Sequence, residues 1–386
     1  MYGYLALICF VAQLATSEAN VIHGNEVIDD KQLVLAFVVH RHGDRAPDAD
    51  ELSLSDEQEK IRNLTRLEGL EGLTNLGKRR AYQIGKYIKQ RYGPQGLGLI
   101  SNLYLQDDIA IRSTDKERTK MTALVAMAAV YPPEVEQQWD EGVGKVWQPV
   151  PYSAKPLAED FLRYYSNCNK FKALMAKAKE ESITKEFLPY KDLVAKLEKK
   201  TGRNFTENPL LFETLFDLFK SQVGLGLDIP EWAKPLLPRL SEAARLAYRL
   251  YFRSDEMLKI GGGVLLQQFT EAATALALGK PVTKRLRIFS AHDFNVGALM
   301  DVSRVVKDQS IPEYGSVFAL ELYRRKGGVL TVEPVFLNQA GESSPQVLTI
   351  AGCGPICDLE KFTQLTEKFL LSEEKFYEVC GIKSEL

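Results

Sequence analysis

Histidine, long apolar runs and an excess of either charge are scarce in this chain, and each scarcity excludes a class of protein. The 386 residues include only four histidines, too few for a typical His-rich binuclear metal site. Beyond the N-terminus, no apolar run reaches the roughly 20 residues that a transmembrane helix needs. The 49 basic and 51 acidic residues nearly cancel, so nothing favours nucleic acid or an anionic membrane as a partner. The composition is that of a globular protein, one large domain with an insertion or two modest domains.

Cysteine is also sparse, with five residues, and Cys9 falls in a predicted secretory signal over residues 1–17. Residues 4–14 are mostly apolar but too short to cross a bilayer, and small residues placed for cleavage follow at Ala15-Thr16-Ser17. Removal of this segment leaves an even number of cysteines, which suits two disulfides in a secreted or secretory-lumen protein. In that compartment two sequons would accept glycans, Asn63-Leu64-Thr65 and Asn204-Phe205-Thr206.

The four remaining cysteines favour one particular pairing. Cys353 and Cys357, four residues apart, could be half of a zinc site or a local disulfide. No histidine lies nearby and no second close cysteine pair exists, so the local disulfide is favoured. Cys168 and Cys380 are then left for each other, which would join the middle of the chain to its C-terminal region.

The chain is organised around residues 33–47, LVLAFVVHRHGDRAP, where seven apolar residues run into two histidines, two arginines and an aspartate. The apolar part has no polar alternation, which is typical of a central strand buried on both faces. The charged residues then lie at its C-terminal end, where ligands bind in open α/β sheets. Burying Arg41 and Arg45 without an acidic partner would be costly, so we expect an anion between them.

Two later segments repeat the pattern of an apolar strand that ends in charged residues. Residues 109–115 deliver Arg112, and residues 113–115 offer a cap for the next helix. Residues 286–293 deliver His292 and Asp293. If these strands are parallel, all three ends gather on one rim of the sheet.

The other segments predict mainly helices. Residues 157–238 consist of amphipathic helical segments with few strand signals, so we interpret them as a helical cap inserted into an α/β domain formed by residues 32–156 and 239–386. Within that domain we expect a helix at residues 75–92, capped by Thr74 and ended by Gly93, and further helices through residues 121–130 and at 359–371. Residues 240–252 and 265–278 are expected to form two sheet-covering helices separated by Gly261–Gly263. Residues 317–323 and 329–336 are expected to form a hairpin.

The predicted rim has the chemistry of a phosphate site. Arginine forks match phosphate oxygens bidentately, so three arginines and a histidinium would bind a dianion that gains charge in its transition state. A neutral histidine ring can attack phosphorus, and Asp293 is placed to protonate a departing alcohol oxygen. The rival is a metal site at His40-x-His42, as in barrel amidohydrolases, but the histidine count opposes it, and we expect His40 in the core or supporting the site.

These residues resemble the histidine acid phosphatase family. Residues 41–47 fit its RHGxRxP signature, and Ala291-His292-Asp293 fits its downstream HD pair. Phe294 departs from the small polar residue that often follows this pair. The likeness to the prostatic and venom branch covers most of the chain after the signal, through Leu73-Thr74-x-x-Gly77, Arg112-Ser-Thr-Asp115, Trp147-Gln-Pro-Val-Pro151, Gly262-Gly-Val-Leu265 and Cys353-x-x-x-Cys357.

The resemblance implies a secreted acid phosphatase that hydrolyses phosphate monoesters and needs no metal or other cofactor. It implies a phosphoglycerate-mutase-like three-layer α/β domain with a mostly parallel sheet and a smaller helical cap, and the same two disulfides. It implies His42 as the phosphorylated nucleophile and Asp293 as the proton donor. The implied phosphate-binding residues are Arg41, Arg45, Arg112 and His292.

Two alternatives stay open at this point. A phytase-like enzyme for inositol phosphates would need extra Lys and Arg along the cap, where the sequence has no obvious basic cluster. A non-catalytic secreted ligand-binding protein on the same fold should lack one catalytic side chain, whereas His42, Arg112 and Asp293 are all present. The expected partner is a small phosphomonoester substrate, with no nucleic acid and no membrane span, and a homodimer is compatible with the sequence.

Overall fold

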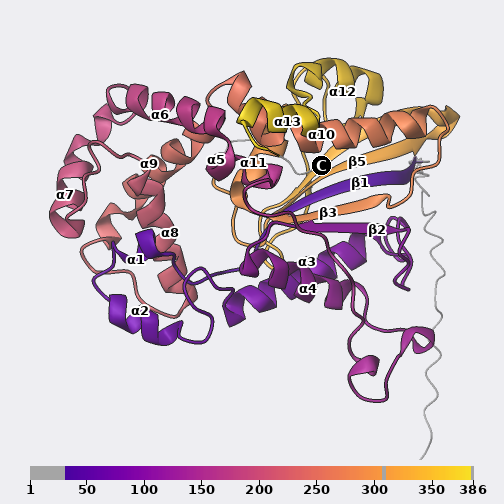
Figure 1. Ribbon diagram of the computed structural model, residues 1–386, viewed down its shortest axis with the longest axis horizontal. Coiled ribbons are helices and arrows are strands. Elements are labelled where there is room, and N and C mark those ends of the chain that lie inside the picture. The colour runs from indigo at the N-terminus through magenta and orange to yellow at the C-terminus, as the bar shows by residue number, and fades with distance from the viewer. Residues whose placement is uncertain (1–30, 307–309, 384–386) are drawn as a thin grey trace, which may run out of the picture. The chain divides into compact units, whose positions relative to one another are not determined.

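The computed structural model describes residues 31–306 and 310–383, and the predicted signal segment lies outside them (Figure 1). In this part of the chain the main sheet has seven strands in the order β2-β3-β1-β5-β6-β7, with β9 paired to β6. A separate pair joins β4 and β8. The strands are β1 Lys31–Arg41, β2 Ile109–Ser113, β3 Leu286–Ala291, β4 Val305–Val306, β5 Val317–Arg325, β6 Leu330–Leu337, β7 Gln346–Val347, β8 Thr349–Ile350 and β9 Cys357–Asp358.

The sheet is mixed, so the α/β class is confirmed but the prediction of a mostly parallel sheet is wrong. Strands β2, β3 and β1 are parallel, whereas β1–β5, β5–β6, β6–β7 and β6–β9 are antiparallel pairs. The predicted hairpin is the reason: β5 and β6 are joined by a turn at Lys326–Gly328, and a connection this short joins only antiparallel strands. The three parallel strands are those that carry the predicted site.

Both faces of β1 are covered, which explains its unbroken apolar run. Leu33, Ala36 and Val38 pack in one core with α3 and α4. Phe37 and Val39 pack in a second core with α10 to α13, on the other side of the sheet (Figure 1). These helices are α3 Asn75–Tyr92, α4 Glu117–Val130, α10 Asp255–Ala277, α11 Asp293–Val302, α12 Leu359–Thr366 and α13 Glu373–Cys380.

The sequence predicts some helix ends correctly and others not. Thr74 caps α3 by accepting a hydrogen bond from the Gly77 N–H, and the helix stops before Gly93, as predicted. Helix α4 spans Glu117–Val130 and so includes the predicted helical residues 121–130, but its cap residue is Lys116, which makes no side-chain bond, so the predicted cap at residues 113–115 is wrong. The predicted helix 359–371 stops at Thr366, and α13 is not predicted at all.

The three glycines at 261–263 lie inside α10 and do not separate two helices, contrary to the prediction. They lie where α10 packs closely against its neighbours. A Cβ on Gly262 would lie 2.6 Å from the Ala298 carbonyl oxygen of α11, and one on Gly263 would lie 2.4 Å from the Phe369 carbonyl oxygen. The glycines therefore let α10 approach its neighbours at backbone distance.

A third hydrophobic core lies among helices away from the sheet (Figure 1). Helix α9 belongs to this core with α8, so its predicted place over the sheet is wrong, because an amphipathic stripe does not specify its partner. Helices α1 and α2 join it from outside residues 157–238, so the division into domain and cap stays a prediction. The helices of this region are α1 Ala49–Leu52, α2 Gln58–Leu64, α7 Lys191–Thr201, α8 Leu211–Gly224 and α9 Leu237–Arg249. Helices α5 Tyr164–Asn167 and α6 Asn169–Ile183 contribute Tyr164 and Phe171 to the core that holds α10 to α13.

The two predicted disulfides are confirmed. Cys353 pairs with Cys357, four residues away, and Cys168 pairs with Cys380 across 212 residues. The second bond joins the start of α6 to the end of α13. Among the described residues, no helix is both long and apolar enough to span a membrane.

Candidate active site

The C-terminal ends of β1 and β3 place their charged residues side by side. The two strands are parallel, and Arg41 lies opposite Ala291. The His42 N–H donates to the Ala291 carbonyl oxygen at 3.1 Å, and the His42 carbonyl accepts from the Gly315 N–H at 3.1 Å. These bonds fix the backbone of the motif between its neighbours. The His42 and His292 rings are consequently 5.5 Å apart between centroids.

A pair of glycines lets α3 press on the motif from the other side. A Cβ on Gly43 would lie 2.2 Å from the Gly77 carbonyl oxygen, and a Cβ on Gly77 would lie 2.0 Å from the Asp44 carbonyl oxygen. Thr74 also donates from its hydroxyl to that Asp44 carbonyl at 3.0 Å. The first turn of α3 therefore supports the loop directly after His42.

The His42 ring has a defined tautomer. Its Nδ1 lies 2.8 Å from the Gly43 carbonyl oxygen, which can only accept, so Nδ1 carries the proton. Its Nε2 accepts from the Arg118 Nε–H at 3.0 Å and so presents a lone pair to the cleft. Burial and the charges of Arg118 and Arg41 lower the pKa of His42 well below its ordinary value of 6.5. The buried ring is therefore neutral, and its unprotonated Nε2 is held by the Arg118 guanidinium.

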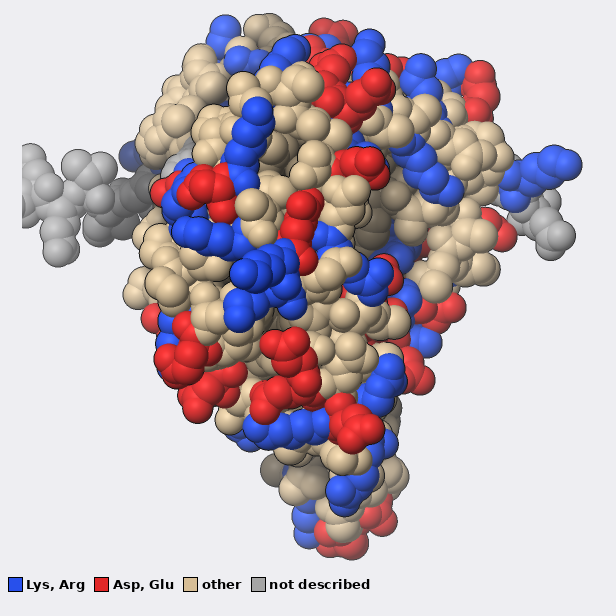
Figure 2. All heavy atoms as spheres, turned by 90° about the vertical axis from the view of Figure 1, so that its left-hand side faces the viewer, with Lys and Arg blue, Asp and Glu red and all other residues tan. Residues whose placement is uncertain are grey.

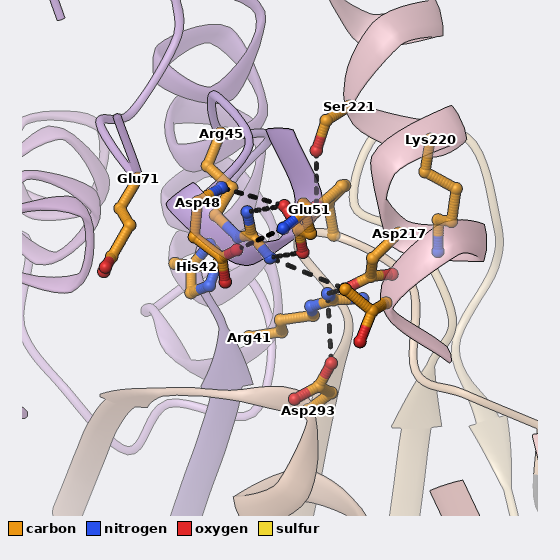
Figure 3. A network of polar contacts seen from close by, with 12 residues as sticks. Arg41, His42, Arg45, Asp48, Glu51, Glu71, Asp217, Lys220, Ser221 and Asp293 are labelled. Atoms are coloured by element: carbon orange, nitrogen blue, oxygen red, sulfur yellow. Dashed lines mark hydrogen bonds and ion pairs between the residues drawn. The ribbon is translucent and has the colours of Figure 1, made fainter. Parts of the chain in front are cut away.

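Arg41 and Arg45 each have acidic partners (Figure 3). The Arg41 Nη2 lies 3.1 Å from an Asp217 oxygen and 3.0 Å from an Asp293 oxygen. Arg45 makes a bidentate pair with Glu51, at 2.7 and 2.5 Å. These carboxylates supply negative charge that the sequence led us to expect from a bound anion alone. The sequence argument missed them because Asp217 lies on α8, far along the chain.

His292 is the N-cap residue of α11, and Asp293 is the first residue of that helix. The His292 Nε2 lies 3.1 Å from the Thr114 hydroxyl, and burial together with Arg118 and Arg163 lowers the pKa of this ring well below 6.5. The Asp293 Oδ1 accepts from the Phe294 N–H at 2.8 Å, which turns its other oxygen toward Arg41. Both side chains line the same cleft as His42.

Arg112 lies outside this cleft, which corrects its predicted place beside the phosphate. Side chains alternate along β2, so Ile111 faces the α3–α4 core and Arg112 points to the other side. There its guanidinium pairs with Asp160 at 2.6 Å and lies 4.0 Å from the Phe161 ring centroid. Arg118, in the first turn of α4, is the arginine after β2 that reaches His42.

The cleft has a volume of about 280 Å³ and several residues that the sequence argument missed. Glu51 could have been found, because Asp48-x-x-Glu51 is a capping-box pattern that starts α1. Nothing in the sequence pointed to Glu213 or Asp217, since two acids on an amphipathic helix are usually solvated. The missed lining residues include Asp48, Asp50, Glu51, Glu71, Lys116, Arg118, Arg163, Tyr165, Glu213, Thr214, Asp217 and Tyr251.

His40 is a core residue. Its side chain is fully buried, and its Nδ1 lies 3.3 Å from the Arg41 carbonyl oxygen. Burial lowers the pKa of His40 to about 4, so the ring is neutral. His40 does not line the cleft, so it and His42 do not face a common ion.

The two sequons differ in their surroundings. Asn204 and Thr206 are both exposed in the segment after α7. Asn63 is exposed on α2, but the Thr65 hydroxyl of its sequon is buried and donates to the Ile61 carbonyl oxygen at 2.9 Å. Both asparagines are therefore at the surface.

The main sheet is mixed, and two histidines, an aspartate and several arginines lie at the ends of its parallel strands. This combination of fold and site is that of a phosphate-handling enzyme, and comparison with known proteins supports the same class. The chain is 32% identical over 345 residues to prostatic acid phosphatase of Homo sapiens, covering 87% of this chain and 85% of the relative. It is 30% identical over 342 residues to a venom acid phosphatase of Apis mellifera, covering 88% and 85%. Lysosomal acid phosphatase of Bos taurus matches at 30% over 350 residues, covering 87% and 78%.

Solved structures agree on the fold. The phytase from Citrobacter braakii superposes with a TM-score of 0.62 at 14% identity, over 89% of this chain and 98% of that one. The Hafnia alvei phytase bound to myo-inositol hexakis sulphate gives 0.62 at 16%, over 90% and 99%. Residues 32–332 match the histidine phosphatase superfamily (branch 2). The chain therefore belongs to this family, and it is a phosphoric monoester hydrolase.

Proposed function

We propose that this enzyme is a secreted acid phosphatase that hydrolyses phosphate monoesters through a phosphohistidine on His42. The observation that carries the proposal is the His42 ring itself, with its proton held on Nδ1 by the Gly43 carbonyl and its Nε2 facing a group of arginines. A neutral imidazole in that setting is a nucleophile aimed at the position where a phosphate would bind. The names of the relatives support the acid phosphatase assignment.

The reaction would proceed in two displacements. His42 Nε2 forms a bond to phosphorus while the ester P–O bond breaks, and Asp293 gives its proton to the leaving oxygen. A water molecule then attacks phosphorus, its proton passes to Asp293, and the P–N bond breaks to release inorganic phosphate. Arg41, Arg45 and Arg118 would hold the phosphoryl oxygens and balance the charge that develops on them.

An acid working range is compatible with this mechanism. The pKa of His42 is lowered, so the ring keeps its lone pair at pH values where an ordinary histidine is protonated. An acidic medium at the same time favours the protonated form of the acid that assists the leaving group. The nucleophile and the acid can then both be in their active forms below neutral pH.

The test of this proposal is to trap the intermediate. Radiolabelled phosphate should be found on His42 during turnover after an alkaline quench, since the P–N bond is acid-labile. His42→Ala should neither incorporate label nor turn over substrate above background. Turnover without label on His42, or a His42→Ala variant with near-wild-type activity, would refute the mechanism, and absence of any turnover by the wild type would favour the non-catalytic ligand-binding alternative.

The charge of the cleft argues against the phytase alternative. Its lining has five basic side chains and seven acidic ones, whereas an inositol polyphosphate would need a surplus of positive charge. On the face formed by the outer helices, Lys and Arg are interspersed with Asp and Glu (Figure 2). In a panel of phosphomonoesters we therefore expect small singly phosphorylated substrates to have a higher kcat/KM than inositol hexakisphosphate, and the opposite order would favour the phytase alternative. The basic residues are Arg41, Arg45, Lys116, Arg118 and Arg163, and the acidic ones are Asp48, Asp50, Glu51, Glu71, Glu213, Asp217 and Asp293.

Secretion and glycosylation complete the proposal. The disulfides support an oxidising compartment. Exposed Asn63 and Asn204 are the proposed glycan acceptors. Treatment with peptide N-glycosidase should reduce the mass of the secreted protein, and an unchanged mass would show that neither asparagine is modified. A homodimer stays a prediction.

A further inference from the structure

Helix α8 presents two acidic side chains to the cleft, and only one of them has a partner. Glu213 and Asp217 are four residues apart, so they lie on the same side of the helix, and both line the cleft. Asp217 pairs with Arg41 at 3.1 Å and lies 3.6 Å from Arg45 (Figure 3). Within the described residues, the Glu213 side chain has no hydrogen bond and no ion pair.

The local charges do not balance if every acid is ionised. Arg45 forms an ion pair with Glu51, and Arg41 forms ion pairs with both Asp217 and Asp293. The fourth carboxyl group, Glu213, makes no ion pair with any Lys or Arg of the part of the chain that the structure describes. The nearest lysine on α8, Lys220, is itself paired with Glu313 at 2.6 Å. A carboxylate without a partner in this setting is costly, and the group avoids that cost by keeping its proton.

We propose that Glu213 is the proton reservoir of the reaction, holding at working pH the proton that Asp293 passes to the leaving oxygen. This inference rests on the proposed phosphatase mechanism and extends it. In the free enzyme Asp293 is an ion-pair partner of Arg41, at 3.0 Å. It can act as an acid only after it receives a proton, and Glu213 is the protonated neighbour in the same cleft.

The proton movements balance over one turnover. When the phosphate dianion draws the Arg41 guanidinium to itself, Asp293 loses its cation and takes the proton of Glu213. Asp293 then gives this proton to the ester oxygen as the P–O bond breaks and the bond to His42 forms. In the second displacement Asp293 takes a proton from the attacking water, and that proton returns to Glu213 as the P–N bond breaks.

The surroundings of Glu213 support a protonated resting state. Burial, with the carboxylates of Asp293 and Asp217, raises the pKa of Glu213 well above its ordinary value, and Arg41 opposes this. Tyr248 and Tyr251 are close enough for Glu213 to raise the pKa of their hydroxyl groups, so neither is a charged partner near neutral pH. The titratable and charged groups that share the cleft with it are Arg41, His42, Arg45, Asp48, Asp50, Glu51, Glu71, Lys116, Arg118, Arg163, Tyr165, Asp217, Tyr251, His292 and Asp293.

The test compares Glu213→Gln with wild type on propyl phosphate and para-nitrophenyl phosphate across pH. Propyl phosphate needs an acid for its leaving group, whereas nitrophenolate leaves without help. With glutamine the pair no longer holds the shared proton, so the alkaline limb of kcat/KM for propyl phosphate should move to lower pH by about one unit or more. The nitrophenyl phosphate profile should not move. Glu213→Asp should restore most of the shift.

Controls separate this role from a structural one. Glu207→Gln removes an exposed carboxylate shortly before α8 and should leave both profiles unchanged. A Glu213→Gln variant whose alkaline limb for propyl phosphate is unmoved, or whose profiles for both substrates change equally, would overturn the proposal. If that variant does not fold, infrared difference spectra of the wild type decide. A protonated carboxyl band should vanish with the midpoint of propyl phosphate turnover, and in Glu213→Asp this band should be present at a changed frequency; a band that titrates elsewhere, or is the same in Glu213→Asp, would overturn the proposal. Failure to label His42 would instead refute the underlying mechanism.

Discussion

Arg112 and Arg118 lie six residues apart and have opposite consequences when removed. Arg118→Ala removes the charged donor beside His42, so turnover should fall by about 10- to 150-fold, with a small change in unfolding free energy. Arg112→Ala leaves the fully buried Asp160 without its partner, which should cost about 3 to 5 kcal/mol of stability. Its folded fraction should stay active.

The measurement pairs steady-state kinetics with urea unfolding for the two variants. Each serves as the control for the other, because both remove one arginine from the same segment. Loss of turnover in folded Arg112→Ala, with Arg118→Ala fully active, would restore the interpretation drawn from the sequence alone.

Asp293 gives a second prediction at the level of a single side chain. Asp293→Asn keeps the oxygen that accepts from the Phe294 N–H but cannot donate an acidic proton. Turnover of alkyl phosphates should fall by about 10²- to 10⁴-fold, far more than turnover of nitrophenyl phosphate. Inhibition by inorganic phosphate should be nearly unchanged. Equal losses on both substrates would show that Asp293 only positions groups.

At the level of elements, α3 supports the motif through Gly77. Gly77→Ala would place a Cβ 2.0 Å from the Asp44 carbonyl oxygen, so the loop after His42 must move. Overpacking of this kind costs about 1 to 3 kcal/mol, which outweighs the gain of about 1 kcal/mol that alanine brings to a helix. We expect a lower midpoint of thermal unfolding together with a loss of kcat. Lys86→Ala, on the exposed face of the same helix, should change neither, and a fully active Gly77→Ala would contradict this account.

The sequence predicts elements well where local chemistry decides them. The unbroken apolar run of β1 and the cap at Thr74 are examples, because burial on two faces and a hydroxyl cap leave direct marks on residue type. Prediction from the sequence fails where an element's position depends on the element it packs against. Helix α9 could have packed on the sheet or on α8, and a one-residue difference in strand facing sends Arg112 away from the cleft. The acids at 213 and 217 become visible only when α8 meets β1.

At the level of the whole molecule, the two disulfides should differ in their effect on stability. The bond between Cys168 and Cys380 closes a loop of 212 residues, and chain entropy assigns it about 5 kcal/mol. The bond between Cys353 and Cys357 closes only four residues and is worth about 2 kcal/mol. Double alanine variants of each pair, unfolded in urea, should show this difference. Equal losses would mean that the entropy of the unfolded chain is not what these bonds control.

Arg41 joins two parts of the molecule that have separate hydrophobic cores. It extends from β1 and contacts Asp293 of α11 on the sheet side and Asp217 of α8 on the side of the outer helices. A bound phosphate would add its own contacts at this junction and stabilise the packing of the two cores against each other. Catalysis therefore depends on their docking, so mild denaturant should end activity before the sheet unfolds, and an occupied site should postpone that separation.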